Sequence, residues 1–187
     1  MKKTLIVNLF GGPGCGKSTT MARLFADLKT RGYNVEMVSE FAKDLVYEQR
    51  QETMKDELYI FAKQHHRLFR VNEKVDIIIT DRPLLLTNIY AELYLPDDEF
   101  RKALTKLVRT TFKTFYNINI MLNRKGIEYK ENEGRLQDLE EAELIDKLTV
   151  QELSVTRSPF MMKPTNDYNS ILNAVLSAID FEKDYRE

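Results

Sequence analysis

The segment at residues 11–19, GGPGCGKST, combines glycines, a lysine and hydroxyl side chains at the spacing of a phosphate-binding loop. Glycines let such a loop aim several backbone N–H groups at phosphate oxygens, because no side chain blocks their approach. Lys17 would reach the β- and γ-phosphates, and the Ser18 hydroxyl would bind Mg²⁺. We therefore predict a nucleotide-binding P-loop made of consecutive residues: Gly11, Gly12, Pro13, Gly14, Cys15, Gly16, Lys17, Ser18 and Thr19.

The residues on either side of this loop supply the elements that position it. An apolar run at 5–10 precedes the loop and an amphipathic stretch ending near Gly32 follows it, which predicts a strand, the loop and then a helix. The N-terminus of that helix would add the positive end of its dipole to the anion site. A glycine-rich turn that binds nothing is disfavoured, because the motif and its setting are both present.

Two carboxylates follow predicted strands and would complete the chemistry of the site. Asp81 comes directly after an almost wholly apolar run at 75–80, the position of a Walker B aspartate that holds Mg²⁺. Glu40 follows the predicted strand at 35–38, where it would accept the proton of an attacking hydroxyl. Two alternatives stay open: Asp81 as a helix cap before Pro83, and Glu40 as a solvated residue at a helix start.

A polar segment at 124–136 has the composition of a lid over bound ATP. Residues 124–135, RKGIEYKENEGR, hold two glycines, two arginines and two lysines, with little apolar content. Such a lid excludes water and delivers positive charge to the migrating phosphoryl group. Arg124 and Arg135 are the candidates for that charge, since a guanidinium grips two phosphate oxygens at once. Arg82, beside the Walker B aspartate, would orient the acceptor. An exposed loop without a role is the alternative for the lid.

The hydrophobic pattern predicts strands alternating with helices. Strands are expected at 5–10, 35–38, 75–80, 118–122 and, shorter, 160–163. Helices are expected from the loop to about 32, and at 41–50, 52–72, 84–95, from 97 to about 112, and at 168–180, with an irregular region between the last two strands. Near-continuous apolar strands separated by helices indicate an α/β fold with a parallel sheet between helical layers. Ligands of such sheets bind at the carboxyl ends of the strands, where the polar residues collect.

Composition limits the classes of protein that fit. The 187 residues, 43% of them hydrophobic, predict a single domain over 1–187. One cysteine allows no internal disulfide, and the N-terminal apolar run is too brief for a signal peptide, so we expect a cytoplasmic protein. There is no apolar run of membrane-spanning length, and 28 basic against 29 acidic residues make nucleic acid an unfavoured partner without excluding it. The oligomeric state stays open.

Two classes of P-loop protein do not fit the sequence. A GTPase would carry a glycine three residues after Asp81, where Leu84 stands, and an NKxD motif, whose nearest candidate reads NRKG at 123–126. An AAA-type motor would need a helical domain after the core and usually a longer chain. A kinase with a lid fits better.

Four segments together resemble the ribosylnicotinamide-kinase-like P-loop proteins, a group that includes small AAA-annotated ATP-binding proteins. These segments are GGPGCGKST, SEFAKDLVYEQ at 39–49, TDRPLLLTNIYAELY at 80–94 and the lid residues 129–135. The resemblance implies a three-layer P-loop NTPase fold with a five-stranded parallel sheet ordered 2-3-1-4-5 and a short lid. It also implies that Glu40 contacts the acceptor hydroxyl. The pair Asp81-Arg82 resembles deoxynucleoside-kinase signatures equally well, which leaves the acceptor open.

The residues and the resemblance lead to one expectation: an ATP- and Mg²⁺-dependent kinase that phosphorylates a small nucleoside-like or nucleotide-like acceptor. Its candidate catalytic residues are Lys17, Glu40, Asp81, Arg124 and Arg135, its metal ligands Ser18 and Asp81, and its acceptor contacts Glu40 and Arg82. Aromatic residues that would wall the acceptor pocket, or else belong to the core, are Tyr47, Tyr59, Phe61 and Tyr90, and the segment at 163–167 would pass the adenine ring. Two rival functions remain: a kinase acting on polynucleotide ends or modified DNA bases, and an ATP-binding switch that acts through a protein partner.

Overall fold

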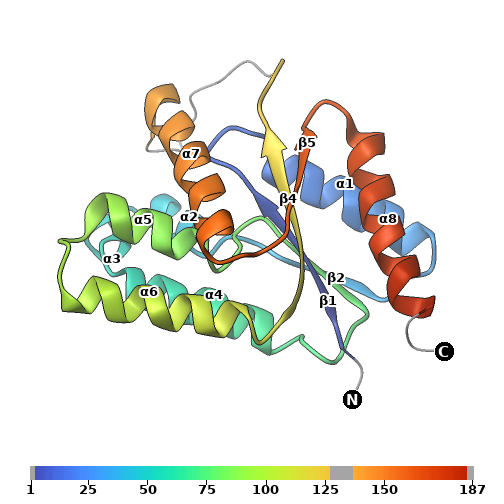
Figure 1. Ribbon diagram of the computed structural model, residues 1–187, viewed down its shortest axis with the longest axis horizontal. Helices are drawn as coiled ribbons and strands as arrows, with labels where there is room; N and C mark the ends of the chain where they lie inside the picture. Colours follow the sequence, from blue (N-terminus) through green and yellow to red (C-terminus); the bar gives the residue numbers. More distant parts are fainter. Residues whose placement is uncertain (1–2, 127–136, 185–187) are drawn as a thin grey trace.

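The computed structural model describes residues 3–126 and 137–184 and places a five-stranded parallel sheet at its centre, in the order β2-β3-β1-β4-β5 (Figure 1). Strand β1 (Leu5–Phe10) lies in the middle and pairs with β3 (Ile77–Thr80) and β4 (Tyr116–Asn123). Strands β2 (Val35–Val38) and β5 (Met161–Pro164) form the edges. The expected α/β fold and strand order are confirmed.

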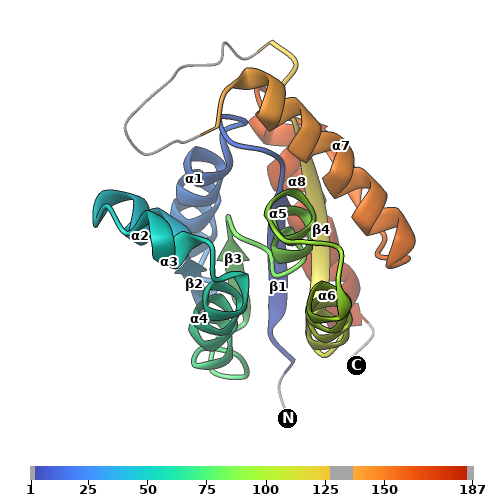
Figure 2. The same cartoon turned by 90° about the vertical axis from the view of Figure 1, so that its left-hand side faces the viewer.

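Helices cover both faces of the sheet (Figures 1 and 2). One face carries α1 (Lys17–Thr30) and α8 (Tyr168–Asp184), and the other carries α4 (Glu57–Phe69), α5 (Leu86–Tyr94), α6 (Glu99–Phe112) and α7 (Leu139–Val155). Two short helices, α2 (Ala42–Tyr47) and α3 (Gln51–Met54), follow β2. No helix in these described residues is long and apolar enough to cross a membrane.

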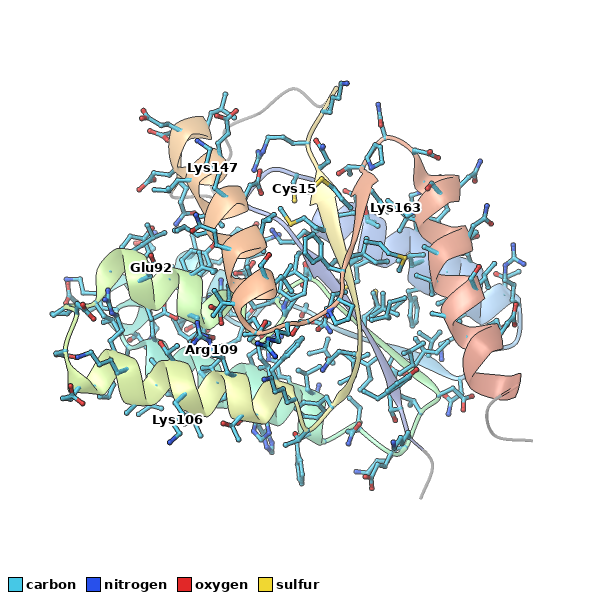
Figure 3. The ribbon with its side chains drawn as sticks, in the orientation of Figure 1. Cys15, Glu92, Lys106, Arg109, Lys147 and Lys163 are labelled. Carbon is cyan, nitrogen blue, oxygen red and sulfur yellow. The ribbon has the colours of Figure 1, made fainter. Side chains whose placement is uncertain are left out.

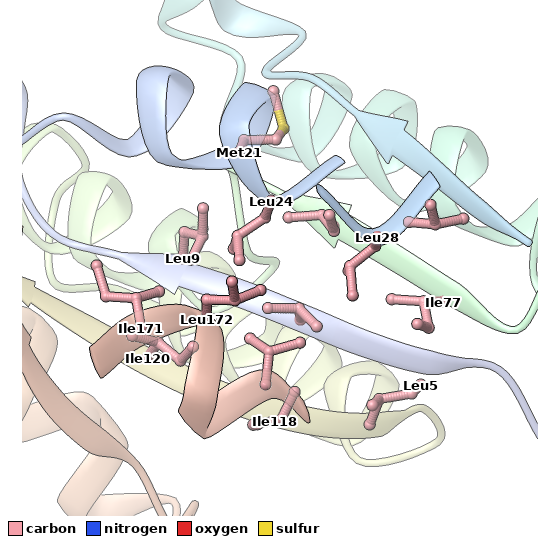
Figure 4. Packing of buried hydrophobic residues seen from close by; sticks show 14 of the residues in the cluster. Leu5, Leu9, Met21, Leu24, Leu28, Ile77, Ile118, Ile120, Ile171 and Leu172 are labelled. Carbon is pink, nitrogen blue, oxygen red and sulfur yellow. The ribbon is translucent and has the colours of Figure 1, made fainter. Parts of the chain in front are cut away.

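The alternation of side chains along the strands divides the core into two layers. Leu5, Val7 and Leu9 of β1 pack with α1 and α8, whereas Ile6 and Phe10 pack with the opposite helices. Figure 4 shows the first layer, in which the leucines of α1 lie over the central strands. Because successive strand residues point to opposite faces, an apolar strand supplies both layers.

On the second face, one buried ion pair joins three helices. Arg109 of α6 donates two hydrogen bonds to the carboxylate of Glu152 on α7, at 2.9 and 2.6 Å, and Asn88 of α5 donates to the same carboxylate at 2.7 Å. Figure 3 shows Arg109 directed from α6 towards these neighbours. A bidentate guanidinium–carboxylate pair fixes orientation as well as distance, so it holds α7 against the helices below it.

The helix expected at 52–72 is wrong in one respect, because the chain breaks between α3 and α4. Asp56 lies at the break, and its side chain accepts a hydrogen bond from the Tyr59 backbone N–H at 2.9 Å. This is the N-cap geometry that begins a new helix.

The irregular region expected between the last two strands contains α7, which the sequence reading missed. Asp138 caps this helix by accepting a hydrogen bond from the Glu141 N–H at 2.9 Å. Ala142, Ile145 and Leu153 form part of its buried side. The missed helix matters because it packs directly on the phosphate-binding loop.

Candidate functional site

The loop after β1 has the backbone conformation that its glycines permit. Gly11, Gly14 and Gly16 have φ angles of +138°, +78° and +87°, a region that side chains with a Cβ rarely adopt. Helix α1 begins at the next residue, Lys17, whose Nζ donates to the carbonyl oxygens of Gly11 at 2.6 Å and Gly12 at 3.0 Å. The lysine ammonium therefore lies across the loop at the N-terminal end of the helix, where an anion is favoured.

Asp81 lies at the carboxyl end of β3 and faces the start of α1. It is 4% exposed, makes a side-chain hydrogen bond with Ser18 and accepts a hydrogen bond from the Glu40 N–H at 3.0 Å. Burial and the nearby Glu40 carboxylate raise the pKa of Asp81, while the Ser18 hydrogen bond and the Lys17 charge oppose that rise. A hydroxyl and a carboxylate oxygen beside the phosphate-binding loop form a donor set that fits Mg²⁺.

Next to Asp81, Arg82 is buried between two carboxylates. Its Nη1 donates to Glu40 Oε1 at 3.0 Å, and its Nη2 lies 4.0 Å from Glu57 Oε2, while the guanidinium lies 4.2 Å above the ring of Tyr90. Burial alone would lower the pKa of Arg82, but the two carboxylates and Tyr90 raise it, so the guanidinium stays charged.

Glu57, in the first turn of α4, is the most perturbed carboxyl beside this arginine. It is 4% exposed, and its Oε2 makes no hydrogen bond. Burial raises the pKa of Glu57 to about 7, with Arg82 acting against the shift and the Glu40 and Asp56 carboxylates adding to it. A carboxyl of this kind exchanges its proton near neutral pH.

A cavity of about 560 Å³ joins the phosphate-binding loop to this cluster. Helices α2 to α5 and α7 contribute its remaining walls. Its lining residues are Pro13, Gly14, Gly16, Lys17, Ser18, Thr19, Glu40, Ala42, Lys43, Val46, Met54, Lys55, Glu57, Ile60, Arg82, Leu86, Tyr90, Tyr94, Gln137 and Glu141. A cavity of this size and mixed polarity can hold a small molecule.

Helix α7 binds the other side of the loop through Asp146 and Arg124. The Gly12 N–H donates to Asp146 Oδ1 at 2.5 Å, and Arg124 Nε donates to Asp146 Oδ2 at 2.7 Å. Arg124 also donates to the carbonyl oxygens of Pro13 and Ala142, each at 3.2 Å. A Cβ on Gly12 would lie 2.3 Å from the Ala142 oxygen, so the close approach of α7 requires glycine there.

The structure gathers most of the predicted site residues but not all of them. Lys17, Ser18, Glu40 and Arg82 line the cavity, with Asp81 directly behind them, whereas Arg124 lies against the far side of the loop. Arg135 and most of the lid expected at 124–136 lie outside the described residues.

The other predicted contacts are divided between cavity, core and surface. Tyr90 lines the cavity, Phe61 is buried in the core, and Tyr47 is 63% exposed. In the segment at 163–167, Thr165 donates to the carbonyl oxygens of Cys15 and Asn123, at 2.9 and 3.1 Å, and so lies beside the phosphate-binding loop.

Sequence reasoning missed Glu57 and Asp146. Glu57 was part of a helix pattern in which only the apolar positions were expected to be buried. Asp146 belongs to the missed helix α7, which its cap at Asp138, the glutamates of its first turn and its spaced apolar residues could have revealed.

Comparison with known proteins agrees with this geometry. A family model described as an AAA domain matches residues 6–170. A crystal structure of NadR protein in complex with NR matches with a TM-score of 0.62 and 18% identity, covering 92% of this chain and 50% of that one. Thymidylate kinase from Ehrlichia chaffeensis matches with a TM-score of 0.62 and 17% identity, covering 95% and 99%.

A second NadR structure, in complex with NAD and AMP-PNP, matches with a TM-score of 0.58 and 19% identity, covering 92% of this chain and 48% of that one. The chain thus spans about half the length of the NadR chains. No curated protein matches it in sequence. The fold is that of the P-loop nucleoside and nucleotide kinases, as the residues led us to expect.

Proposed function

We propose that this chain, which belongs to the AAA domain family, is an ATP- and Mg²⁺-dependent kinase that phosphorylates a small nucleoside-like or nucleotide-like acceptor. One observation carries the proposal: a single cavity has the phosphate-binding loop at one end and the Glu40–Arg82 pair at the other. A donor phosphate and an acceptor hydroxyl bound there would meet between Lys17 and Glu40. The kinase folds of NadR and thymidylate kinase support the same assignment.

Each residue of the cavity would have a separate task in phosphoryl transfer. The loop N–H groups and Lys17 would bind the β- and γ-phosphates, and Glu40 would accept the proton of the attacking hydroxyl. Ser18 and Asp81 would hold Mg²⁺, which neutralises charge on the phosphates. Arg82 fixes the direction of the Glu40 carboxylate through its hydrogen bond at 3.0 Å. The chemistry is then mainly positioning and charge neutralisation, because the transition state is loose.

The direct test is phosphoryl transfer from labelled ATP and Mg²⁺ to a panel of acceptors. The panel contains nucleosides, nucleoside monophosphates, ribosylnicotinamide and DNA, with an acceptor-free control and the Lys17→Ala variant. A labelled small product formed by the wild type and not by Lys17→Ala supports the kinase. ATP loss that no acceptor changes would contradict it and favour a nucleotide-dependent switch.

A further inference from the structure

The inner end of the cavity contains a polar atom without a partner. Glu57 is 4% exposed, and its Oε2 forms no hydrogen bond although it lines the space next to Glu40 and Arg82. The distance of 4.0 Å to Arg82 Nη2 allows electrostatic attraction but is too long for a hydrogen bond. A buried oxygen left unpaired costs free energy, which a ligand donor would recover.

The charge of this inner end is negative on balance. The single guanidinium of Arg82 faces two carboxylates, one at 3.0 Å and one at 4.0 Å, and its flat face lies on Tyr90. Its side chain is 4% exposed, so it offers no open fork for a phosphate group. A phosphate placed beside this cluster would face an excess carboxylate in a partly desolvated cavity, which is unfavourable.

The remaining cations that line the cavity lie elsewhere. Lys17 belongs to the donor loop. Lys43 and Lys55 are exposed at the rim, and Lys55 pairs with Glu52 at 2.7 Å. Between the rim and the inner cluster the wall is apolar, formed by Val46, Met54, Ile60 and Leu86. Such a wall suits a flat ring or another apolar group rather than a charged one.

On the basis of the proposed kinase function, we propose that Glu57 binds the acceptor through its unpaired Oε2, and that the acceptor is an unphosphorylated nucleoside-like molecule rather than a nucleoside monophosphate. Glu57 accepts a hydrogen bond from a hydroxyl or amino group of the acceptor, while Glu40 faces the hydroxyl that attacks the donor. The neutral acceptor fits between the two carboxylates, and an added phosphate group is repelled by them.

The test is equilibrium binding, measured by titration calorimetry, of matched pairs of nucleosides and their 5′-monophosphates to the full-length protein, with phosphoryl transfer measured in parallel. We expect at least one nucleoside to bind about tenfold or more tightly than its monophosphate. Glu57→Gln should weaken nucleoside binding by about tenfold and narrow the discrimination between the pair. Glu99→Gln is the matched control, because Glu99 also lies in the first turn of a helix but is exposed and distant from the cavity.

The selectivity of the wild type tests the proposal even if Glu57→Gln proves unstable. Monophosphates that bind as tightly as nucleosides, no binding by any pair, or unchanged nucleoside binding in folded Glu57→Gln would each overturn it. Monophosphate binding that is lost in Lys43→Gln would assign a phosphate site to the rim lysine and also overturn it. Nucleoside-selective binding without transfer would support this inference and contradict the kinase, whereas transfer that prefers monophosphates would do the reverse.

Discussion

Glu40 has its backbone and its side chain fixed by different neighbours. Its N–H donates to Asp81 at 3.0 Å, which sets the backbone, and its carboxylate accepts from Arg82 at 3.0 Å, which sets the direction of the side chain. The side chain is still 26% exposed towards the cavity. A carboxylate held in one direction but reachable by a ligand suits proton abstraction.

Glu40→Gln should therefore lower kcat by about 10²–10⁴ and leave ATP affinity nearly unchanged. Glutamine keeps an oxygen that accepts from Arg82, so the change removes the base and not the contact. Steady-state kinetics on the best acceptor, together with ATP binding by calorimetry, check this. Glu36→Gln, an exposed glutamate on the same strand, serves as the control. Wild-type turnover in Glu40→Gln would remove Glu40 from the reaction.

Glu57 makes folding stability depend on pH in a predictable direction. The pKa of its carboxyl is about 7 in the folded protein against a usual value of 4.5. Between these pH values the unfolded chain releases the proton while the native chain keeps it, so burial of Glu57 costs stability progressively as pH rises. The loss is complete above pH 7 and amounts to at most about 3 kcal/mol.

Glu57→Gln lacks this titration and should gain stability relative to the wild type between pH 5 and 8. Chemical denaturation at several pH values measures the difference in free energy of unfolding. Glu99→Gln should show no such pH-dependent difference. A difference between Glu57→Gln and wild type that stays constant with pH would mean that Glu57 has an ordinary pKa.

At the scale of elements, helix α7 and the phosphate-binding loop form one unit. Asp146 accepts from the Gly12 N–H and from Arg124, and Arg124 in turn donates to the Pro13 carbonyl oxygen. The side chains of Arg124 and Asp146 are 15% and 20% exposed, so these charged hydrogen bonds are largely protected from water. Helix α7 therefore fixes the start of the loop from outside the nucleotide site.

Asp146→Ala should loosen this unit and weaken ATP binding several-fold. It leaves the Gly12 N–H and the Arg124 guanidinium without their acceptor, which should also cost about 1–3 kcal/mol of stability. Calorimetry with ATP and denaturant unfolding measure the two effects. Glu143→Ala, an exposed acidic residue on the same helix, is the control. If Asp146→Ala binds ATP like wild type, α7 does not position the loop.

Local patterns predicted most elements and failed where packing decides. The strand expected at 35–38 coincides with β2, and that at 118–122 lies within the longer β4, because apolar strands stand out between polar turns. The helix expected at 52–72 breaks at Asp56 because its side chain caps α4. That break brings the end of α3 and the start of α4 to the cavity, which periodicity does not express.

At the scale of the whole molecule, the sheet order explains why distant residues meet. Strand β1 lies beside β3, and β3 beside β2, so their carboxyl ends bring together the phosphate-binding loop, Asp81 with Arg82, and Glu40. The strand order was expected from the family resemblance rather than from any single pattern. Glu57 could not be predicted, because its burial and its missing partner depend on how α4 packs against β3 and α5.

The same architecture predicts a global response to nucleotide. ATP with Mg²⁺ at about one hundred times its Kd should stabilise the fold by about 2.7 kcal/mol and raise Tm by about 5–10 °C. Lys17→Ala, which removes the ammonium that crosses the loop, should show little of this shift. Thermal unfolding followed by circular dichroism measures both proteins. Equal shifts in the two proteins would place ATP outside the P-loop.

The central claim is that ATP hydrolysis is not the reaction and that the γ-phosphate goes to an acceptor. The most direct measurement is the ratio of phosphorylated acceptor to ADP, both quantified in one reaction with the best acceptor, and the rate of ADP formation without it. We predict that the two products appear in equal amounts and that ADP formation nearly stops when the acceptor is omitted. ADP formed at the same rate without any phosphorylated acceptor would contradict the account.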